Sequence, residues 1–182
     1  MNKSSICLIG GMGPQASSYM YKLIIDMAVK DYHSKNNDDF PEIILYSLPV
    51  PDFISNPKNQ QLALNMLQDR ISRLNSFNIS SYSLVCNTAH LFLQDLNIIS
   101  KVPFVSMIDE VAKTVKEDCK KKVGILGSPT TLRSRLYQNA LAKYKIDSII
   151  PTATETSILE KIIRSIINGT TDSRDKKNLN SM

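Results

Sequence analysis

The 182-residue sequence lacks long hydrophobic runs. None of its apolar stretches approaches the about 20 residues that a membrane-spanning helix needs, so no contact with the membrane is predicted. The apolar stretch near the N-terminus is too short for a signal peptide and has no small-residue cleavage site after it. We therefore expect this stretch to form a first strand and the protein to be cytoplasmic.

Cysteine is also scarce, and the three cysteines are far apart: Cys7, Cys86 and Cys119. An odd number without a CxxC pair favours reduced thiols over a disulfide framework, and the spacing predicts no metal site. Cys7 lies within the predicted first strand, so we expect it in the core. Cys119 lies in a charged segment, which indicates an exposed helix end.

The excess of positive charge is modest, at +5. Its densest stretch, Lys120-Lys121-Lys122, adjoins two acidic residues and is typical of a solvated helix end. The other basic residues are scattered, and no aromatic side chains interleave with them as on a nucleic-acid-binding surface. The sequence therefore predicts no nucleic-acid partner.

Apolar runs alternate with helical-period segments along the whole chain. The runs are continuous, as in parallel strands buried on both faces. The expected strands are Ser5–Gly10, Glu42–Leu48, Ser81–Cys86, Phe104–Met107, Lys122–Gly127 and Asp147–Ile150. The expected helix stripes are Met20/Leu23/Ile24/Met27, Ala63/Leu67/Ile71/Leu74 and the isoleucine-rich stretch Ile158–Ile167. This alternation predicts an α/β fold with right-handed crossovers.

Four loops follow predicted strands and carry most of the candidate functional groups. Open α/β sheets place their ligand sites at the carboxyl ends of the strands. The loops are Gly10–Gln15, Leu48–Phe53, Cys86–His90 and Gly127–Thr131. We therefore expect the chemistry of this protein at that edge.

The first loop also matches the looser dinucleotide fingerprint, as Gly11-x-Gly13-x-x-Ala16. However, no acidic residue ends the second predicted strand to bind a ribose, and Pro14 removes one backbone donor from a phosphate cradle. A tight strand-to-helix turn is the favoured interpretation, and a nucleotide site is the alternative.

Cys86 stands between an apolar run and the polar residues Asn87 and Thr88. These two residues are good helix N-caps, and a thiol at a helix N-terminus tends to have a lowered pKa. His90 follows four residues later, so a Cys–His pair on one helical turn is a second possibility. A small buried core residue is the third.

Three motifs together resemble the aspartate/glutamate racemase family. They are Gly10-Gly11-Met12-Gly13-Pro14, Cys86-Asn87-Thr88-Ala89-His90, and Gly124–Thr131 followed by Ser134 and Tyr137. The resemblance implies two similar α/β lobes, each with a parallel sheet flanked by helices, which we expect over residues 1–100 and 101–182. It also implies a homodimer that holds an acidic amino acid between its lobes and uses no pyridoxal phosphate, other cofactor or metal.

The resemblance further implies roles for single residues. Cys86 would be the catalytic acid/base, because racemisation needs a thiol on each face of the α-carbon. Met12 and Gly13 would border the substrate. The expected substrate-binding side chains, which would stabilise charge on the substrate, are Asn87, Thr88, Ser128 and Thr131.

Two departures from the family pattern limit this hypothesis. The family's second cysteine lies in a Gly-Cys-Thr-Glu motif that this sequence lacks, so we expect the C-terminal part of the fold to be missing and racemisation to be impaired. Aspartate-specific relatives also commonly have an arginine where Phe53 follows Pro51-Asp52 in this sequence. The substrate's side-chain carboxylate would then need another partner, Lys161 or Arg164, which leaves aspartate, glutamate and less acidic substrates open.

The sequence therefore predicts a cofactor-independent amino-acid racemase acting on aspartate or glutamate. One alternative is a single-thiol relative, such as a decarboxylase, isomerase or Cys–His hydrolase. Another is a protein that binds an acidic amino acid without turning it over.

Overall fold

The computed structural model describes residues 4–54 and 56–182, which form an α/β fold. These residues divide into two compact units. The first unit comprises Met1–Phe53 and Lys58–Ser106, and the second comprises Ile54–Pro57 and Met107–Met182. Each unit has its own parallel sheet and its own hydrophobic core.

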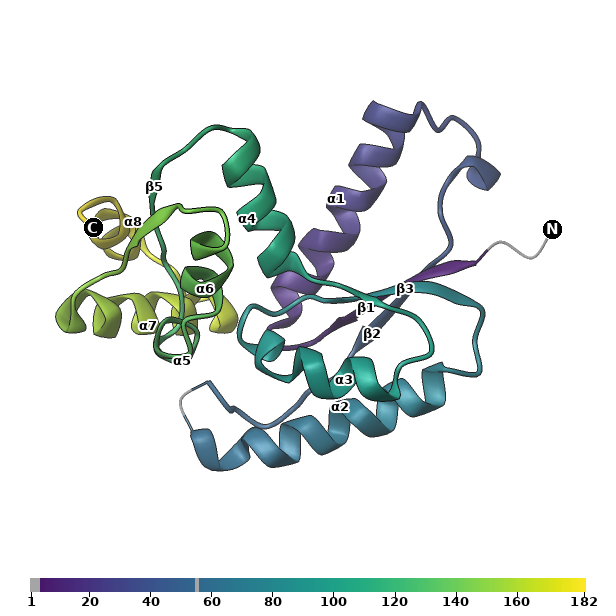
Figure 1. Cartoon of the computed structure of the whole chain (residues 1–182), viewed down its shortest axis with the longest axis horizontal. Helices are drawn as coiled ribbons and strands as arrows, with labels where there is room; N and C mark the ends of the chain where they lie inside the picture. The colour runs from purple at the N-terminus through teal and green to yellow at the C-terminus, as the bar shows by residue number, and fades with distance from the viewer. Residues whose placement is uncertain (1–3, 55) are drawn as a thin grey trace. The chain divides into compact units, whose positions relative to one another are not determined.

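The first unit is built on a four-stranded parallel sheet in the order β2-β1-β3-β4. Its strands are β1 (Ser5–Gly10), β2 (Ile43–Ser47), β3 (Ile79–Leu84) and β4 (Phe104–Val105). Its helices are α1 (Pro14–Tyr32), α2 (Gln60–Leu74) and α3 (Leu93–Ile99), with 3-10 turns η1 (Asn37–Asp39), η2 (Pro57–Asn59) and η3 (Thr88–Phe92). Helix α1 covers one face of the sheet, and α2 and α3 cover the other (Figure 1).

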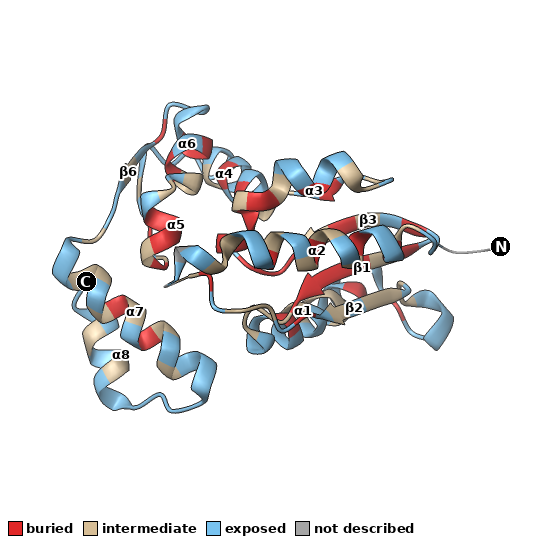
Figure 2. Ribbon diagram, turned by 90° about the horizontal axis from the view of Figure 1, so that it is seen from below, coloured by how far each residue is buried: buried red, intermediate tan, exposed pale blue. Residues whose placement is uncertain are grey.

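The first core lies between the sheet and α2. The predicted stripe of α2 is confirmed, because all four of its apolar residues are buried: Ala63, Leu67, Ile71 and Leu74. Buried residues also concentrate on β1 and β3 (Figure 2). These two central strands pair in parallel, so that Ile9 lies opposite Leu84. The carboxyl ends of β1 and β3 are thus fixed beside each other by a packed core.

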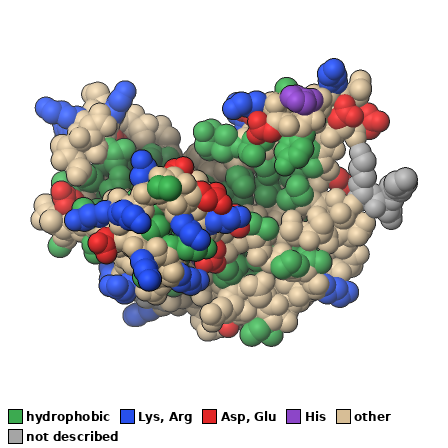
Figure 3. Space-filling model, turned by 45° about the horizontal axis from the view of Figure 1, so that its top comes forward, with side chains coloured by type: hydrophobic (Ala, Val, Ile, Leu, Met, Phe, Trp, Pro, Cys, Tyr) green, Lys and Arg blue, Asp and Glu red, His purple; other side chains and the backbone are tan. Residues whose placement is uncertain are grey.

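The predicted stripe of α1 is buried much less completely. Only Ser17 and Ala28 of this helix are buried, and Met27 is 51% exposed. Further apolar side chains of α1 are exposed at Tyr19, Val29 and Tyr32. Figure 3 shows hydrophobic side chains exposed on several parts of the surface. No helix among the described residues is long and apolar enough to cross a membrane.

The second unit contains a two-stranded parallel sheet of β5 (Lys122–Gly124) and β6 (Asp147–Ile149). Its helices are α4 (Met107–Glu117), α5 (Pro129–Arg133), α6 (Leu136–Ala142), α7 (Ala153–Asn168) and α8 (Ser173–Asn180). A small core joins α4 and α6 with residues beside the sheet, including Ile108, Leu141 and Ile146. Helix α7 begins with a capping box of Thr152 and Glu155 and buries Leu159 and Ile162 from its predicted stripe.

All six expected strands are present, but several of their ends were predicted wrongly. Strand β3 begins and ends two residues before its expected limits, because its serines pair in the sheet although they interrupt the apolar run. The expected strand at Phe104–Met107 is shorter, because α4 already begins at Met107. Strand β5 ends at Gly124, although the Ile125 amide still donates to the Ile149 carbonyl at 2.8 Å.

Candidate functional site

Three of the four predicted loops leave the carboxyl edge of the first unit's sheet side by side. The Leu48 amide donates to the Gly10 carbonyl oxygen at 2.9 Å, which joins the ends of β2 and β1. The Val85 amide donates to the Ile9 carbonyl oxygen at 2.8 Å, which joins the ends of β3 and β1. The motifs around Met12 and Cys86 are therefore neighbours, as the topology of parallel strands requires. The fourth loop, Gly127–Thr131, belongs to the second unit.

The glycine loop is a tight strand-to-helix turn. A Cβ atom on Gly10 would lie 2.0 Å from the Ser17 hydroxyl, and one on Gly11 would lie 2.5 Å from the Leu48 backbone. Gly11 also has a φ of +89°, which favours glycine. Close packing of α1 and β2 against the loop thus accounts for both glycines.

Two backbone positions of the same loop cannot donate to a phosphate group. The Gly11 amide donates to the Ser17 hydroxyl at 2.9 Å, so this donor is already used inside the protein. Pro14 occupies the first turn of α1, as predicted, and has no amide hydrogen. Sequence reasoning did not identify Ser17 as the partner of this loop, although a serine one turn into a helix is placed to accept from the preceding turn.

Cys86 lies just beyond β3, in the first unit's core cluster, and is only 8% exposed. Met12 packs against the same cluster, and Gly13 is the half-buried N-cap residue of α1. Asn87 is exposed and Thr88 is buried. Met12 and Cys86 therefore belong to one packed cluster. Gly13 follows Met12 in the chain, and Asn87 and Thr88 follow Cys86.

The predicted lowering of the thiol's pKa is wrong. Burial raises the pKa of Cys86, and hydrogen bonds from the backbone amides of Ala89 and Thr88 oppose this rise only in part. Asn87 precedes the 3-10 turn η3, and its side chain does not cap that turn. Removal from water therefore outweighs the backbone donors, and the thiol is the resting form at neutral pH.

His90 contacts the backbone of Cys86. Its Nδ1 atom lies 2.9 Å from the Cys86 carbonyl oxygen, and a carbonyl oxygen only accepts, so Nδ1 is the donor. The imidazole is buried, and this hydrogen bond fixes its ring against the turn after β3. The contact therefore supports a role for His90 in holding the loop.

Phe53, at the position where the family resemblance implies an arginine for aspartate, is a core residue. It is 1% exposed, and its ring centroid lies 5.4 Å from that of Phe92. Of the two alternative cations, Arg164 pairs with Glu160 at 3.4 Å and Lys161 is exposed. The second-strand loop thus contributes an aromatic packing contact at this position.

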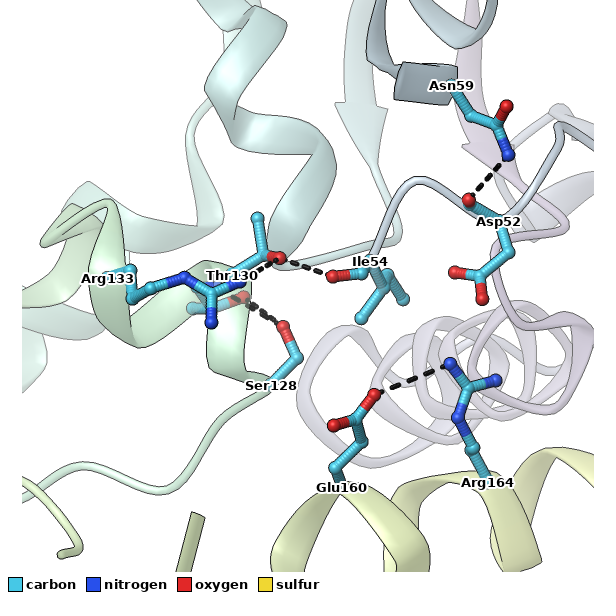
Figure 4. Close-up of polar contacts among 9 residues, drawn as sticks. Asp52, Ile54, Asn59, Ser128, Thr130, Arg133, Glu160 and Arg164 are labelled. Carbon is cyan, nitrogen blue, oxygen red and sulfur yellow. Dashed lines mark hydrogen bonds and ion pairs between the residues drawn. The ribbon is translucent and has the colours of Figure 1, made fainter. Parts of the chain in front are cut away.

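The second unit's candidate hydroxyl groups bind each other (Figure 4). Ser128 is the N-cap of α5: its Oγ accepts from the Thr131 amide at 3.2 Å and lies 3.0 Å from the Thr131 hydroxyl. Both side chains are buried. The neighbouring Thr130 hydroxyl donates to the Ile54 carbonyl oxygen. These hydroxyl groups therefore stabilise the loop and the start of α5.

The other two cysteines differ from Cys86 in their surroundings. Cys7 lies opposite Tyr82 in the middle of the sheet and is fully buried, as predicted. Cys119 is exposed just after α4, also as predicted. In the part of the chain that the structure describes, no cluster of acidic, histidine and cysteine side chains is suited to hold a metal ion.

Comparison with known families agrees with the three motifs. The model of the Asp/Glu/hydantoin racemase family matches residues 9–180 of the chain. The chain belongs to this family. The match extends through both units, from β1 to the end of α8.

Two curated members of the racemase family are similar in sequence. The broad specificity amino-acid racemase RacX of Bacillus subtilis is 29% identical over 136 residues, which are 75% of this chain and 60% of RacX. The glutamate racemase of Oceanobacillus iheyensis is 25% identical over 115 residues, which are 62% of this chain and 42% of that protein. The alignments thus span less than two thirds of either racemase.

Solved structures of racemases share the fold. The aspartate racemase of Picrophilus torridus has a TM-score of 0.80 at 27% identity, over 96% of this chain and 71% of that chain. An aspartate racemase homologue from Pyrococcus horikoshii has a TM-score of 0.72 at 28% identity, over 88% of this chain and 70% of that chain. Parallel sheets flanked by helices are therefore the architecture of this racemase family.

Proposed function

We propose that this protein transfers the α-proton of an acidic amino acid, aspartate or glutamate, by the thiol of Cys86 and without a cofactor. The position of Cys86 is the observation that carries the proposal. The thiol lies at the carboxyl edge of the first sheet, in one of the motifs by which the sequence resembles the racemase family, and accepts hydrogen bonds from two backbone amides. Those amides stabilise the thiolate that proton abstraction requires.

The chemistry follows from the two states of the thiol. As a thiolate, Cys86 would take the α-proton: the Cα–H bond breaks, an S–H bond forms, and the electron pair moves toward the α-carboxylate. As a thiol, it would return a proton to the same carbon. Because burial raises the pKa of Cys86, we expect proton return to be the more favourable half at neutral pH.

Donors at the substrate carboxylate must stabilise the carbanion, since no cofactor would accept its charge. We propose Asn87 and Thr88 for this role, because both directly follow Cys86 in the loop after β3. Met12 and Gly13 would border the substrate from the neighbouring loop. Ser128 and Thr131 are proposed as further substrate-binding residues by family resemblance, and they would have to exchange their mutual hydrogen bond for one to the ligand.

The test is exchange of the α-proton with solvent. Aspartate and glutamate are incubated with the protein in deuterated water, and loss of the Hα signal is followed by proton NMR. We expect exchange by the natural chain and a loss of about 10² to 10⁴-fold in Cys86→Ala. Cys119→Ala is the matched control, because Cys119 is exposed and should leave the rate unchanged. Equal exchange by Cys86→Ala, or none by the natural chain, contradicts the proposal.

Chiral chromatography of the same samples separates exchange from racemisation. The sequence contains no Gly-Cys-Thr-Glu motif, and a single thiol delivers a proton to only one face of the α-carbon. We therefore expect exchange to be faster than interconversion of the D- and L-forms.

A binding function without turnover is the second candidate, and the burial and raised pKa of Cys86 favour it. Saturable binding of aspartate or glutamate without exchange would support this alternative.

We further propose, from the family resemblance, that the protein is a cytoplasmic homodimer. All three thiols are free, which fits a reducing compartment, and light scattering measures the oligomeric state directly.

A further inference from the structure

One residue, His90, closes the turn after β3 with two hydrogen bonds. Its imidazole Nδ1 donates to the Cys86 carbonyl oxygen at 2.9 Å, and its backbone amide donates to the Asn87 carbonyl oxygen at 3.2 Å. His90 is only 5% exposed, so little water competes for these contacts. His90 therefore fixes the backbone of the turn at two consecutive carbonyl groups.

The two amides that donate to the thiol lie inside this closed turn. The Cys86 sulfur accepts from the backbone amides of Thr88 and Ala89, and both of these residues are buried. Rotation of the planar peptide group after Cys86 would move the sulfur relative to both amides. The hydrogen bond from His90 to the carbonyl oxygen of that peptide group opposes the rotation. The imidazole therefore acts on the sulfur through the backbone.

The sheet and the core fix the residues on either side of the turn. Just before Cys86, the Val85 amide donates to the Ile9 carbonyl oxygen at 2.8 Å. Phe92, at the end of η3, belongs to the same core cluster as Cys86. The thiol is thus held between a strand end and a packed turn, as a group that must meet a substrate atom in one geometry has to be.

The direction of the Nδ1 hydrogen bond separates two roles for this imidazole. In a Cys–His pair, a ring nitrogen accepts the proton of the thiol. Here Nδ1 carries a proton and directs it to a backbone oxygen, so this nitrogen is not an acceptor for the thiol. The donors at the sulfur are backbone amides. The geometry therefore favours positioning of the thiol over proton transfer by the imidazole.

We infer that His90 is a positioning residue for Cys86, because its imidazole fixes the turn that directs the Thr88 and Ala89 amides at the sulfur. The inference rests on the proposed function, since α-proton transfer is the reaction that the held thiol would carry out. It adds a residue outside the substrate-binding set proposed above. In this role the hydrogen-bond donor of His90 is required, whereas its ability to titrate is not.

Three substitutions separate the donor from the titrating ring. His90→Asn keeps a donor near the position of Nδ1 and has no titrating group. His90→Leu removes the donor, and His90→Gln keeps an amide but moves it one bond farther from the backbone. The other histidine of the sequence gives the control: His33 is exposed and lies outside the turn, so His33→Gln should behave like the natural chain.

The first measurement is hydrogen exchange of the Thr88 and Ala89 amides, followed by NMR of the ¹⁵N-labelled full chain without substrate. Both amides should exchange about 10-fold faster in His90→Leu, because the loss of one hydrogen bond makes opening of the turn about ten times more favourable. His90→Gln should resemble His90→Leu, and His90→Asn should resemble the natural chain.

The second measurement is α-proton exchange of aspartate and glutamate in deuterated water. The rate should fall about 10 to 100-fold in His90→Leu and His90→Gln, because a displaced thiol is presented to the substrate in a less productive geometry. His90→Asn should retain most of the natural rate. If His90→Leu does not fold, the comparison of His90→Asn with His90→Gln decides in the same way.

The two measurements distinguish failure of this inference from failure of the proposed function. Faster amide exchange in His90→Leu, with no α-proton exchange by the natural chain, would support the positioning of the sulfur and contradict the proposed function alone. Amide exchange at the natural rate in His90→Leu would overturn the inference. An equal loss of α-proton exchange in His90→Asn and His90→Leu would also overturn it, because the titrating ring would then take part in the reaction.

Discussion

The two units place different chemistry at the same kind of junction, where a strand gives way to a turn and a helix. After β3, the sulfur of Cys86 accepts from backbone amides and lies among apolar residues. After β5, the hydroxyl of Ser128 accepts from the Thr131 amide and caps α5. In both, a side chain satisfies amide donors at a chain turn. The Cys86 thiol is the more acidic of the two groups, which is why the proposed proton transfer is placed in the first unit.

The units also differ in what holds them together. The first has a four-stranded sheet with a large buried cluster between the sheet and α2. The second has a two-stranded sheet and a smaller cluster around Ile108 and Leu141. A larger cluster excludes water from more side chains, so we expect the first unit to be the more stable.

Truncation of a core leucine in each unit should have the largest effect. Leu67 is fully buried among residues of the first core, and Leu141 is 2% exposed in the second. We expect Leu67→Ala to lower the free energy of unfolding by about 3–5 kcal/mol and Leu141→Ala by about 2–3 kcal/mol, because the smaller cluster can collapse around the cavity more easily. Urea denaturation measures both values.

Hydrogen exchange shows which unit each substitution weakens. Peptides from β3 should lose protection in Leu67→Ala, and peptides from β5 should lose it in Leu141→Ala. An equal loss throughout the chain in both variants would show that the two units unfold as one, against their division into separate compact units.

A glycine from each unit gives the second comparison. Gly11→Ala combines a φ of +89° with a Cβ 2.5 Å from the Leu48 backbone, so we expect a loss of more than about 2 kcal/mol. Gly124→Ala, on β5, has open space around the new atom and should change stability by less than about 0.5 kcal/mol. Thermal unfolding followed by circular dichroism measures the difference, and equal midpoints would show that the turn after β1 adapts to a side chain.

The strand order of the first unit and the burial of α2 show how much a residue pattern predicts. A period near 3.6 correctly identified Ala63, Leu67, Ile71 and Leu74 as one buried face. The same period in α1 did not predict burial, since Met27 remains half exposed. Periodicity gives the face of a helix that is apolar, but only tertiary packing decides whether another element covers it.

The candidate site was predictable in position but not in its electrostatics. The loops around Met12 and Cys86 meet because parallel strands direct their carboxyl ends to one edge. The direction of the pKa shift at Cys86 depends on how completely the surrounding residues exclude water, which no local motif encodes. The packing role of Phe53 was likewise not predictable from a local motif, because it depends on the contact between its ring and that of Phe92.

Alkaline pH should weaken the first unit through its buried thiols. Burial raises the pKa of Cys7 to about 12, whereas an unfolded chain releases this proton near pH 8.5. The stabilising contribution of Cys7 is therefore complete below about pH 8.5 and is lost as the pH rises toward 12. While only the unfolded chain is deprotonated, the free energy of unfolding should fall by about 1.4 kcal/mol per pH unit.

Urea denaturation at pH 8 and pH 10 (about 1.5 units above the ordinary thiol pKa) tests this dependence. Cys7→Ala should reduce the fall in stability between the two values, even though the variant is less stable at both. Cys119→Ala changes an exposed cysteine of the second unit and should keep the full fall. An identical fall in Cys7→Ala and the natural chain would show that other groups govern the alkaline transition.

The smallest expected effect concerns the cap of α5 and tests the contrast between Ser128 and Cys86 directly. Ser128→Ala removes the acceptor of the Thr131 amide, so the free energy of unfolding should fall by about 1 kcal/mol. Ser128→Thr keeps a hydroxyl acceptor and should recover most of this loss. Because the second unit depends on this hydroxyl for structure, hydrogen exchange should increase in α5 and β5 but not in β3. Loss of α-proton exchange in Ser128→Ala at full stability would support the substrate-binding role proposed for Ser128, whereas unchanged exchange would limit this hydroxyl to capping α5.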